Sequence, residues 1–162
     1  MNIYRVGAFS QAGGNMTIND ALATVDSLVP NTYDRSIKIK WLSTVEGLLL
    51  NNIFSKFQGI PSAARQYVDE GKYPSKVSAD DIPGTAISFS GFDDKTSADT
   101  ELLVPKEYDE IYIQWILAKI HYYNDETIKY NNAALAYDAM QSALRNQWAQ
   151  THMPMQTEMR FF

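Results

Sequence analysis

The stretch 111–123 constrains the fold more than any other part of the sequence, because its apolar residues surround nearly the whole of a helix. They are Ile111, Tyr112, Ile113, Trp115, Ile116, Leu117, Ala118, Ile120, Tyr122 and Tyr123. A helix that is apolar all round is buried on all sides. With 162 residues the chain has the length of one domain, so we expect a subunit interface to supply part of this burial.

Three further segments repeat apolar residues at the spacing of amphipathic helices. The first covers about 17–29 and begins with a capping-box pair, Thr17 and Asp20. The second starts near Asp34 or Ser36, and the last runs from about 126 to 151. The sequence therefore predicts a mainly α protein, a bundle of about four helices with a small β-hairpin-containing insertion.

The predicted elements divide the chain into five segments of one domain. They are an N-terminal arm (1–16), a helical hairpin (17–57), an insertion (58–104), a helical pair (105–152) and a C-terminal docking tail (153–162). The insertion holds four of the eight glycines and three of the six prolines, which favours turns over long helices. Within it, the alternation of residues 86–90 predicts a strand, and we expect 102–104 to be its hairpin partner.

The residue types that most catalytic and cofactor sites need are missing from the chain. Cysteine is absent, which excludes thiolate metal sites, and the only two histidines, His121 and His152, are too far apart for a two-histidine helical motif. No phosphate-binding P-loop or nucleophile elbow occurs. Acidic pairs such as Asp93 and Asp94 lie beside turns, where they cap and solvate the backbone. We therefore expect no enzyme activity, no metal and no cofactor.

The charge and hydropathy of the chain argue against nucleic-acid and membrane binding. The net charge is −5, whereas proteins that bind DNA through phosphates present a basic face. No apolar run approaches the roughly 18 residues of a membrane span, and no signal peptide is expected. We expect the protein to be made and used in a cytoplasm, or in a particle assembled there.

Six of the ten tyrosines lie between residues 108 and 137. An aromatic stripe is usually core, but tyrosine is also enriched at protein interfaces, and both interpretations stay open. The residues predicted for a subunit interface are Tyr108, Tyr112, Trp115, Tyr122 and Tyr123.

The last ten residues carry apolar side chains on a segment too short to form its own core. They are either a frayed terminus or an anchor for a partner's groove, and we favour the anchor because exposed apolar ends are a liability. The residues predicted to dock are Met153, Met155, Met159, Arg160, Phe161 and Phe162.

Residues 100–113, with the sequence TELLVPKEYDEIYI, look like a TELLVPxxYDEIYI segment of small proteins encoded by long-tailed bacteriophages and prophages. The stretches 130–132 and 148–154, with Tyr137 between them, resemble the ending of the same proteins, and 16–28 with 40–42 resembles their opening. These proteins are the head–tail connector, or neck adaptor, family. The first fifteen residues precede the usual start of the family, and 58–98 is longer than in its members.

The resemblance implies a mostly helical subunit of a homo-oligomeric ring, commonly a dodecamer. Such a ring is a structural part of the virion: it lies in the neck between portal and tail, conducts DNA and docks the tail. The implied partners are the portal protein and tail-side neck proteins, either a stopper or a tail terminator. The tail 153–162 is then expected to dock on the portal. DNA would pass through the lumen without specific binding, because an acidic protein repels phosphates.

Two alternatives stay open. A DNA-packaging factor of the small-terminase type is also a helical ring, but it needs a basic helix, for which Arg35, Lys38 and Lys40 are the candidates. A helical enzyme with a site built from dispersed residues is the third interpretation. Ring formation would separate the first two from the third, and salt-dependent DNA binding would separate the second from the first.

Overall fold

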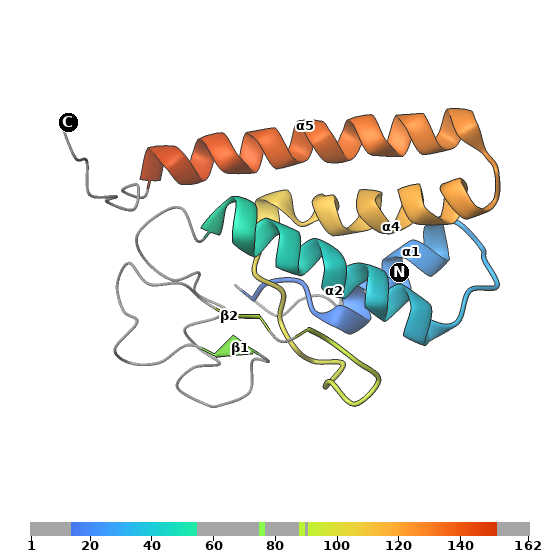
Figure 1. The fold of residues 1–162 in the computed structure, drawn as a ribbon, viewed down its shortest axis with the longest axis horizontal. Helices are drawn as coiled ribbons and strands as arrows, with labels where there is room; N and C mark the ends of the chain where they lie inside the picture. Colours follow the sequence, from blue (N-terminus) through green and yellow to red (C-terminus); the bar gives the residue numbers. More distant parts are fainter. Residues whose placement is uncertain (1–13, 55–74, 77–87, 90, 152–162) are drawn as a thin grey trace, which may run out of the picture.

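The computed structural model describes residues 14–54, 75–76, 88–89 and 91–151. These residues are mainly helical and form α1 (Ile18–Leu28), α2 (Arg35–Asn52), α4 (Glu110–Tyr123) and α5 (Thr127–Thr151) (Figure 1). A one-turn 3₁₀ helix, η4 (Lys106–Tyr108), precedes α4. The four helices confirm the predicted mainly α fold. None of the described helices is long and apolar enough to cross a bilayer.

Helix α1 begins at the predicted capping box. The Thr17 hydroxyl accepts a hydrogen bond from the Asp20 N–H at 3.1 Å, and the Asp20 carboxylate accepts one from the Thr17 N–H at 3.2 Å. The apolar side of the helix enters the core through Ile18, Ala21, Leu22 and Val25. The helix ends before Pro30, where the missing N–H prevents its continuation.

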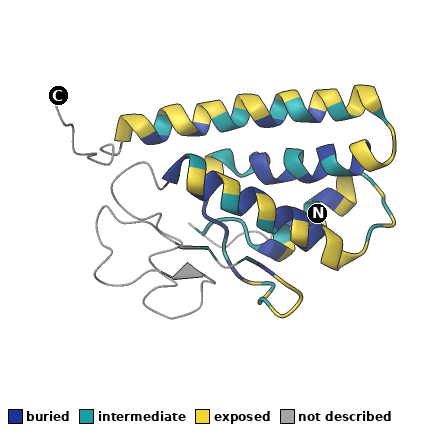
Figure 2. Cartoon of the chain, in the orientation of Figure 1, coloured by how far each residue is buried: buried dark blue, intermediate teal, exposed yellow. Residues whose placement is uncertain are grey.

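Helix α4 is the centre of the bundle, because α1, α2 and α5 all pack against it. The buried residues lie on the sides of the helices that face one another, whereas the outer side of α5 is exposed (Figure 2). The chain's own helices therefore cover most of α4, including Ile111, Tyr112, Ile113, Ile116, Leu117, Ala118 and Ile120, so a second subunit is not needed to bury these residues. That a subunit interface covers the rest of the helix stays a prediction. Of the apolar residues of α4, only Tyr122 and Tyr123 at its C-terminal end are exposed.

Residues 100–104, which we call the core segment, are buried except for Glu101, which is half-buried. The N–H groups of Leu102, Leu103 and Val104 donate to three different acceptors: the Met16 carbonyl, a Glu46 carboxyl oxygen and the Tyr112 hydroxyl, at 2.8, 3.0 and 3.0 Å. The expectation that 102–104 pairs with 86–90 as a hairpin was wrong, because these donors are used elsewhere. Full burial, not strand pairing, explains the apolar run.

Two short strands are described in the predicted insertion. Strand β1 (Ser75–Lys76) pairs antiparallel with β2 (Ser88–Phe89). The rest of 58–90 lies outside the described residues, so a hairpin-containing insertion stays a prediction. After β2, Gly91 adopts a φ of 95°, and the next N–H, that of Phe92, donates to the Ser43 hydroxyl of α2 at 3.0 Å. The chain therefore returns to the bundle alongside α2.

The end of the predicted N-terminal arm belongs to the bundle. Thr17 forms an isolated antiparallel bridge with Glu101, and the Ile18 N–H donates to the Thr100 carbonyl at 3.0 Å. Asn15 donates its backbone N–H to the Glu101 carboxylate at 2.8 Å. The boundary at 16 therefore falls inside a paired region, while residues 1–13 lie outside the described residues.

A buried lysine joins α1 to α2. The Lys38 ammonium group lies 2.6 Å from the Asp26 carboxylate, and only 7 % of the Lys38 side chain is exposed. Burial alone would raise the pKa of Asp26, but the hydrogen bonds from Lys38 and Asn31 outweigh it, so this pKa lies below its usual value. Lys38 is thus a structural residue and adds nothing to a basic surface.

Candidate interaction surface

Among the residues that the structure describes, most of the large exposed apolar side chains lie at one end of the bundle. The end of α1, the start of α2, the end of α4 and the start of α5 meet there, on the right in Figure 1. Their exposed residues are Leu28, Ile37, Tyr122, Tyr123 and Ile128. We call this set the apolar end. Exposure is largest for Ile128, at 77 %, and exceeds half for both tyrosines.

A row of five aromatic side chains links the exposed tyrosines of the apolar end to α2 and α5. Tyr33 meets Trp41 edge-on with ring centroids 5.4 Å apart, and Trp41 stacks on Tyr123 at 5.8 Å. Tyr123 contacts Tyr122 at 5.2 Å, and Tyr122 contacts Tyr130 at 5.6 Å. Such ring pairs contribute about 0.5–1.5 kcal/mol each beyond their area burial. The exposed tyrosines are therefore held in place by rings from α2 and α5.

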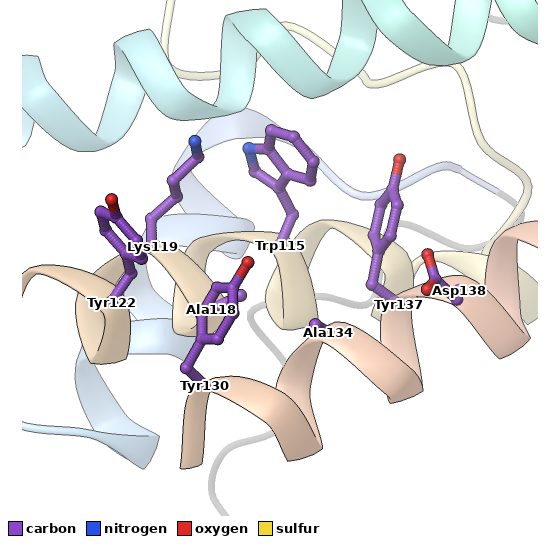
Figure 3. A pocket seen from close by; sticks show the side chains of 8 residues that line it. All are labelled: Trp115, Ala118, Lys119, Tyr122, Tyr130, Ala134, Tyr137 and Asp138. Atoms are coloured by element: carbon purple, nitrogen blue, oxygen red, sulfur yellow. The ribbon is translucent and has the colours of Figure 1, made fainter. Parts of the chain in front are cut away.

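A groove of about 340 Å³ lies between α4 and α5 (Figure 3). Two aromatic pairs stand along it, Tyr122 with Tyr130 and Trp115 with Tyr137, and the second pair has centroids 5.1 Å apart. Small side chains, Ala118 and Ala134, leave the space between them. Its charged residues are Lys119 and Asp138. We call this cavity the α4–α5 groove.

A hydrogen bond and a cation–π contact hold Trp115 in the groove, and the hydroxyl of Tyr137 is protonated at neutral pH. The Trp115 indole N–H donates to the Trp41 carbonyl at 3.0 Å, which holds the ring against α2. The Lys119 ammonium group lies 5.0 Å from the centroid of the same ring, within the range of a cation–π contact. Burial raises the pKa of Tyr137 to about 12, so its hydroxyl stays protonated at neutral pH.

The turn between α4 and α5 is closed by an ionic cluster. His121 Nδ1 donates to Glu126 Oε1 at 3.0 Å, and the Lys129 ammonium donates to Oε2 of the same carboxylate at 3.0 Å. The hydrogen bond from His121, with the bond and charge of Lys129, lowers the pKa of Glu126 to about 2. Across the described part of the chain, no group of three His, Cys, Asp or Glu residues is arranged to hold a metal ion. The cluster ties His121 at the end of α4 to Glu126 and Lys129 at the start of α5.

A buried carboxyl group is the polar residue that the sequence analysis missed. Glu46 of α2 is fully buried, and its oxygens accept hydrogen bonds from the Leu103 N–H and from the Tyr112 hydroxyl. The available signal was a glutamate between Val45 and Leu49 in an otherwise apolar stripe. Its partners belong to the core segment and α4, so it is a structural joint inside the molecule.

The four tyrosines and one tryptophan predicted for a subunit interface do not lie on one surface. Tyr112 is fully buried in the protomer, where its hydroxyl bonds Glu46 and Val104, so that part of the prediction was wrong. Tyr122 and Tyr123 belong to the apolar end, and Trp115 lines the α4–α5 groove.

Tyr108, the remaining residue of that set, is half-buried in η4, at the opposite end of α4 from Tyr122 and Tyr123. The residues predicted to dock on a portal all lie outside the described residues. They are Met153, Met155, Met159, Arg160, Phe161 and Phe162.

Comparison with known proteins identifies no relative of this chain: no protein-family model, no curated protein and no solved structure matches it.

Proposed function

We propose that this protein is a structural virion component, which forms a ring between portal and tail, conducts DNA and docks the tail. The proposal rests on the sequence resemblance to head–tail connector proteins and on the apolar end. It assigns the protein to the neck of the virion, with the portal and tail-side neck proteins as partners and without enzymatic activity. The ring is expected to hold about twelve copies, as is common among the proteins that the chain resembles.

The single structural observation that supports the proposal is the apolar end. The core of the protomer is complete without these side chains, yet five large apolar residues remain at one end. Large exposed apolar side chains gathered at one end of a molecule are typical of an interaction site, and interfaces favour aromatic anchors. Tyr122 and Tyr123 are therefore our candidates for the subunit interface. A ring requires head-to-tail contacts, in which this end meets a different surface of the next copy.

Two further segments complete the proposal. The part of the insertion that precedes the core segment, 58–99, with a small β hairpin, would contact tail-side proteins or neighbouring copies. The tail 153–162 would dock on the portal, where symmetry multiplies weak contacts by avidity. The net charge of −5 suits a lumen through which DNA slides without adhering.

The test is the oligomeric state of the purified full chain by native mass spectrometry and electron microscopy, with and without portal-bearing heads. Rings are expected, and Ile128→Asp at the apolar end should shift them towards monomers. The matched control is Leu135→Asp, which lies on the same helix, is 67 % exposed and falls outside the apolar end. Monomers under every condition, or equal effects of the two variants, would contradict the proposal.

The small-terminase alternative loses one of its supports. Of its three basic candidates on α2, Lys38 is buried and paired with Asp26, which leaves Arg35 and Lys40 exposed. Duplex DNA binding measured against salt concentration distinguishes the two functions, because phosphate contacts give a steep salt dependence. We expect weak binding at physiological salt; tight and steeply salt-dependent binding would favour the packaging factor.

A further inference from the structure

The α4–α5 groove is lined by aromatic rings and has an exposed carboxylate at its edge. Four rings and two alanines line it, and the Asp138 carboxylate is exposed at one end. Among the described residues no cation forms an ion pair with Asp138, whereas Lys119 already lies over the Trp115 ring. The occupant that fits this lining has apolar, ring-stacking side chains and a positive charge beside them.

We propose that the α4–α5 groove binds the C-terminal tail of its own chain, with Arg160 at Asp138 and Phe161 and Phe162 among the aromatic rings. The sequence of the tail supplies the required chemistry: a cation directly followed by two phenylalanines. Met159, just before the cation, adds a flexible thioether, which packs well against aromatic rings.

The tether has the length and direction that the contact requires. From Asp138 to Thr151 the last helix rises about 20 Å, at about 1.5 Å per residue. The chain from Thr151 to Arg160 reaches about 30 Å when extended, at about 3.3 Å per residue, so it can turn back along α5. Phe162 would then lie about 7 Å beyond Arg160, close to the position of Ala134, one helical turn before Asp138.

Because the tail is tethered to the groove through α5, even a weak contact between them would be formed for much of the time. A segment joined to its site by a short flexible link is present at an effective concentration in the millimolar range. A partner for the tail must therefore compete with the groove. If the portal is that partner, portal binding would have to withdraw the tail from the groove. This competition rests on the proposed function, whereas the contact between tail and groove does not.

The absence of cysteine from the chain makes disulfide trapping a clean test. Ala134→Cys combined with Phe162→Cys places one thiol in the groove and one on the tail. The control combines Ala143→Cys with Phe162→Cys. Ala143 is exposed, is nearer to the start of the tail and lies about half a turn around the helix, since nine residues rotate by about 900°. An unbound tail would reach Ala143 at least as often as Ala134.

We expect the Ala134 pair to form an intramolecular disulfide on the order of tenfold faster than the Ala143 pair under mild oxidation. Adding Asp138→Arg should slow the reaction several-fold, and adding Arg160→Asp as well should restore it, which a general effect on folding would not do. Equal rates for the two pairs, or no effect of Asp138→Arg, would overturn the proposal. Cross-linked dimers in place of monomers would also overturn it, because they would assign the groove to a neighbour's tail. None of these measurements needs a portal, so the outcome is independent of ring assembly.

Discussion

Removing the Tyr112 hydroxyl should lower the free energy of unfolding by several kcal/mol, although it removes only one oxygen atom. The hydroxyl donates to Glu46 and accepts the Val104 N–H at 3.0 Å, and all three groups are buried. Tyr112→Phe leaves the Val104 N–H without this acceptor, which costs about 1–3 kcal/mol, and removes one donor from the carboxyl group, for about 1 kcal/mol more. The expected loss is therefore about 2–4 kcal/mol, a large part of the roughly 5–15 kcal/mol that stabilises a domain.

The assay is urea unfolding followed by far-UV circular dichroism at fixed protein concentration. With a slope of about 2 kcal/mol per molar urea, the midpoint should fall by about 1–2 M with the slope unchanged. The matched control is Tyr123→Phe, an exposed tyrosine on the same helix, which should change stability by less than about 0.5 kcal/mol. A loss for Tyr112→Phe as small as that of the control would refute the argument that these hydrogen bonds hold the core segment.

A double-mutant cycle with Glu46 tests the same joint from its other side. Glu46→Gln replaces one accepting oxygen by an amide group that donates, so one of the two donors facing it, Leu103 N–H or Tyr112 hydroxyl, meets another donor. The variants share a partner, so their effects should be less than additive. Strict additivity would mean that Tyr112 and Glu46 act independently.

Three further results are expected in unfolding experiments. Because the folded pKa of Glu126 is lowered to about 2, its contribution is complete above about pH 4.5 and is lost as the pH falls towards 2; Glu126→Gln should flatten the stability curve in that window. Burial, with the charge of Glu110, raises the pKa of Asp109 to about 6, so this carboxylate destabilises the fold above that pH. Asp109→Asn should therefore raise the urea midpoint at pH 7.5 and leave it nearly unchanged at pH 4. Asp26→Asn should destabilise by about 1–2 kcal/mol, because it weakens the partner of the buried Lys38 ammonium, whereas Lys38→Met should cost less.

The helices were predictable because each has a periodic apolar face and local signals at its ends. The capping box at Thr17 placed the start of α1 correctly, and Thr127–Thr151 agrees with the predicted last helix to within one residue. These signals are local, so one sequence suffices to interpret them. The covering of α4 was not predictable in this way, because it depends on how the other three helices pack around it.

The core segment shows why a short apolar run is ambiguous. A buried strand could equally well contain Leu102, Leu103 and Val104. Only the folded positions of Glu46 and Tyr112 decide where the N–H groups of Leu103 and Val104 donate. The same limit applies to the tyrosines. Tyr112 and Tyr123 lie on nearly the same side of one helix, since eleven residues make about three turns, yet Tyr112 is in the core and Tyr123 is exposed. Tyr112, at the start of α4, is covered by the core segment and by Glu46 of α2, whereas Tyr123 lies at the C-terminal end of the helix.

Both ends of the segment 55–88 are attached at α2, which determines how well the chain tolerates changes in the length of this segment. The chain leaves the helix at its C-terminal end, where Phe54 is buried, and returns beside Gly47 and Ser43, whose neighbours are Phe89 and Phe92. The two attachment points are therefore only about 10 Å apart along α2, at about 1.5 Å per residue. The entropy of closing a loop between fixed points grows slowly, by about 0.6 kcal/mol for each doubling of its length. Residues can accordingly be added or removed between these two points at little thermodynamic cost to the bundle, so this is where related chains can diverge most in length while the four helices keep their packing.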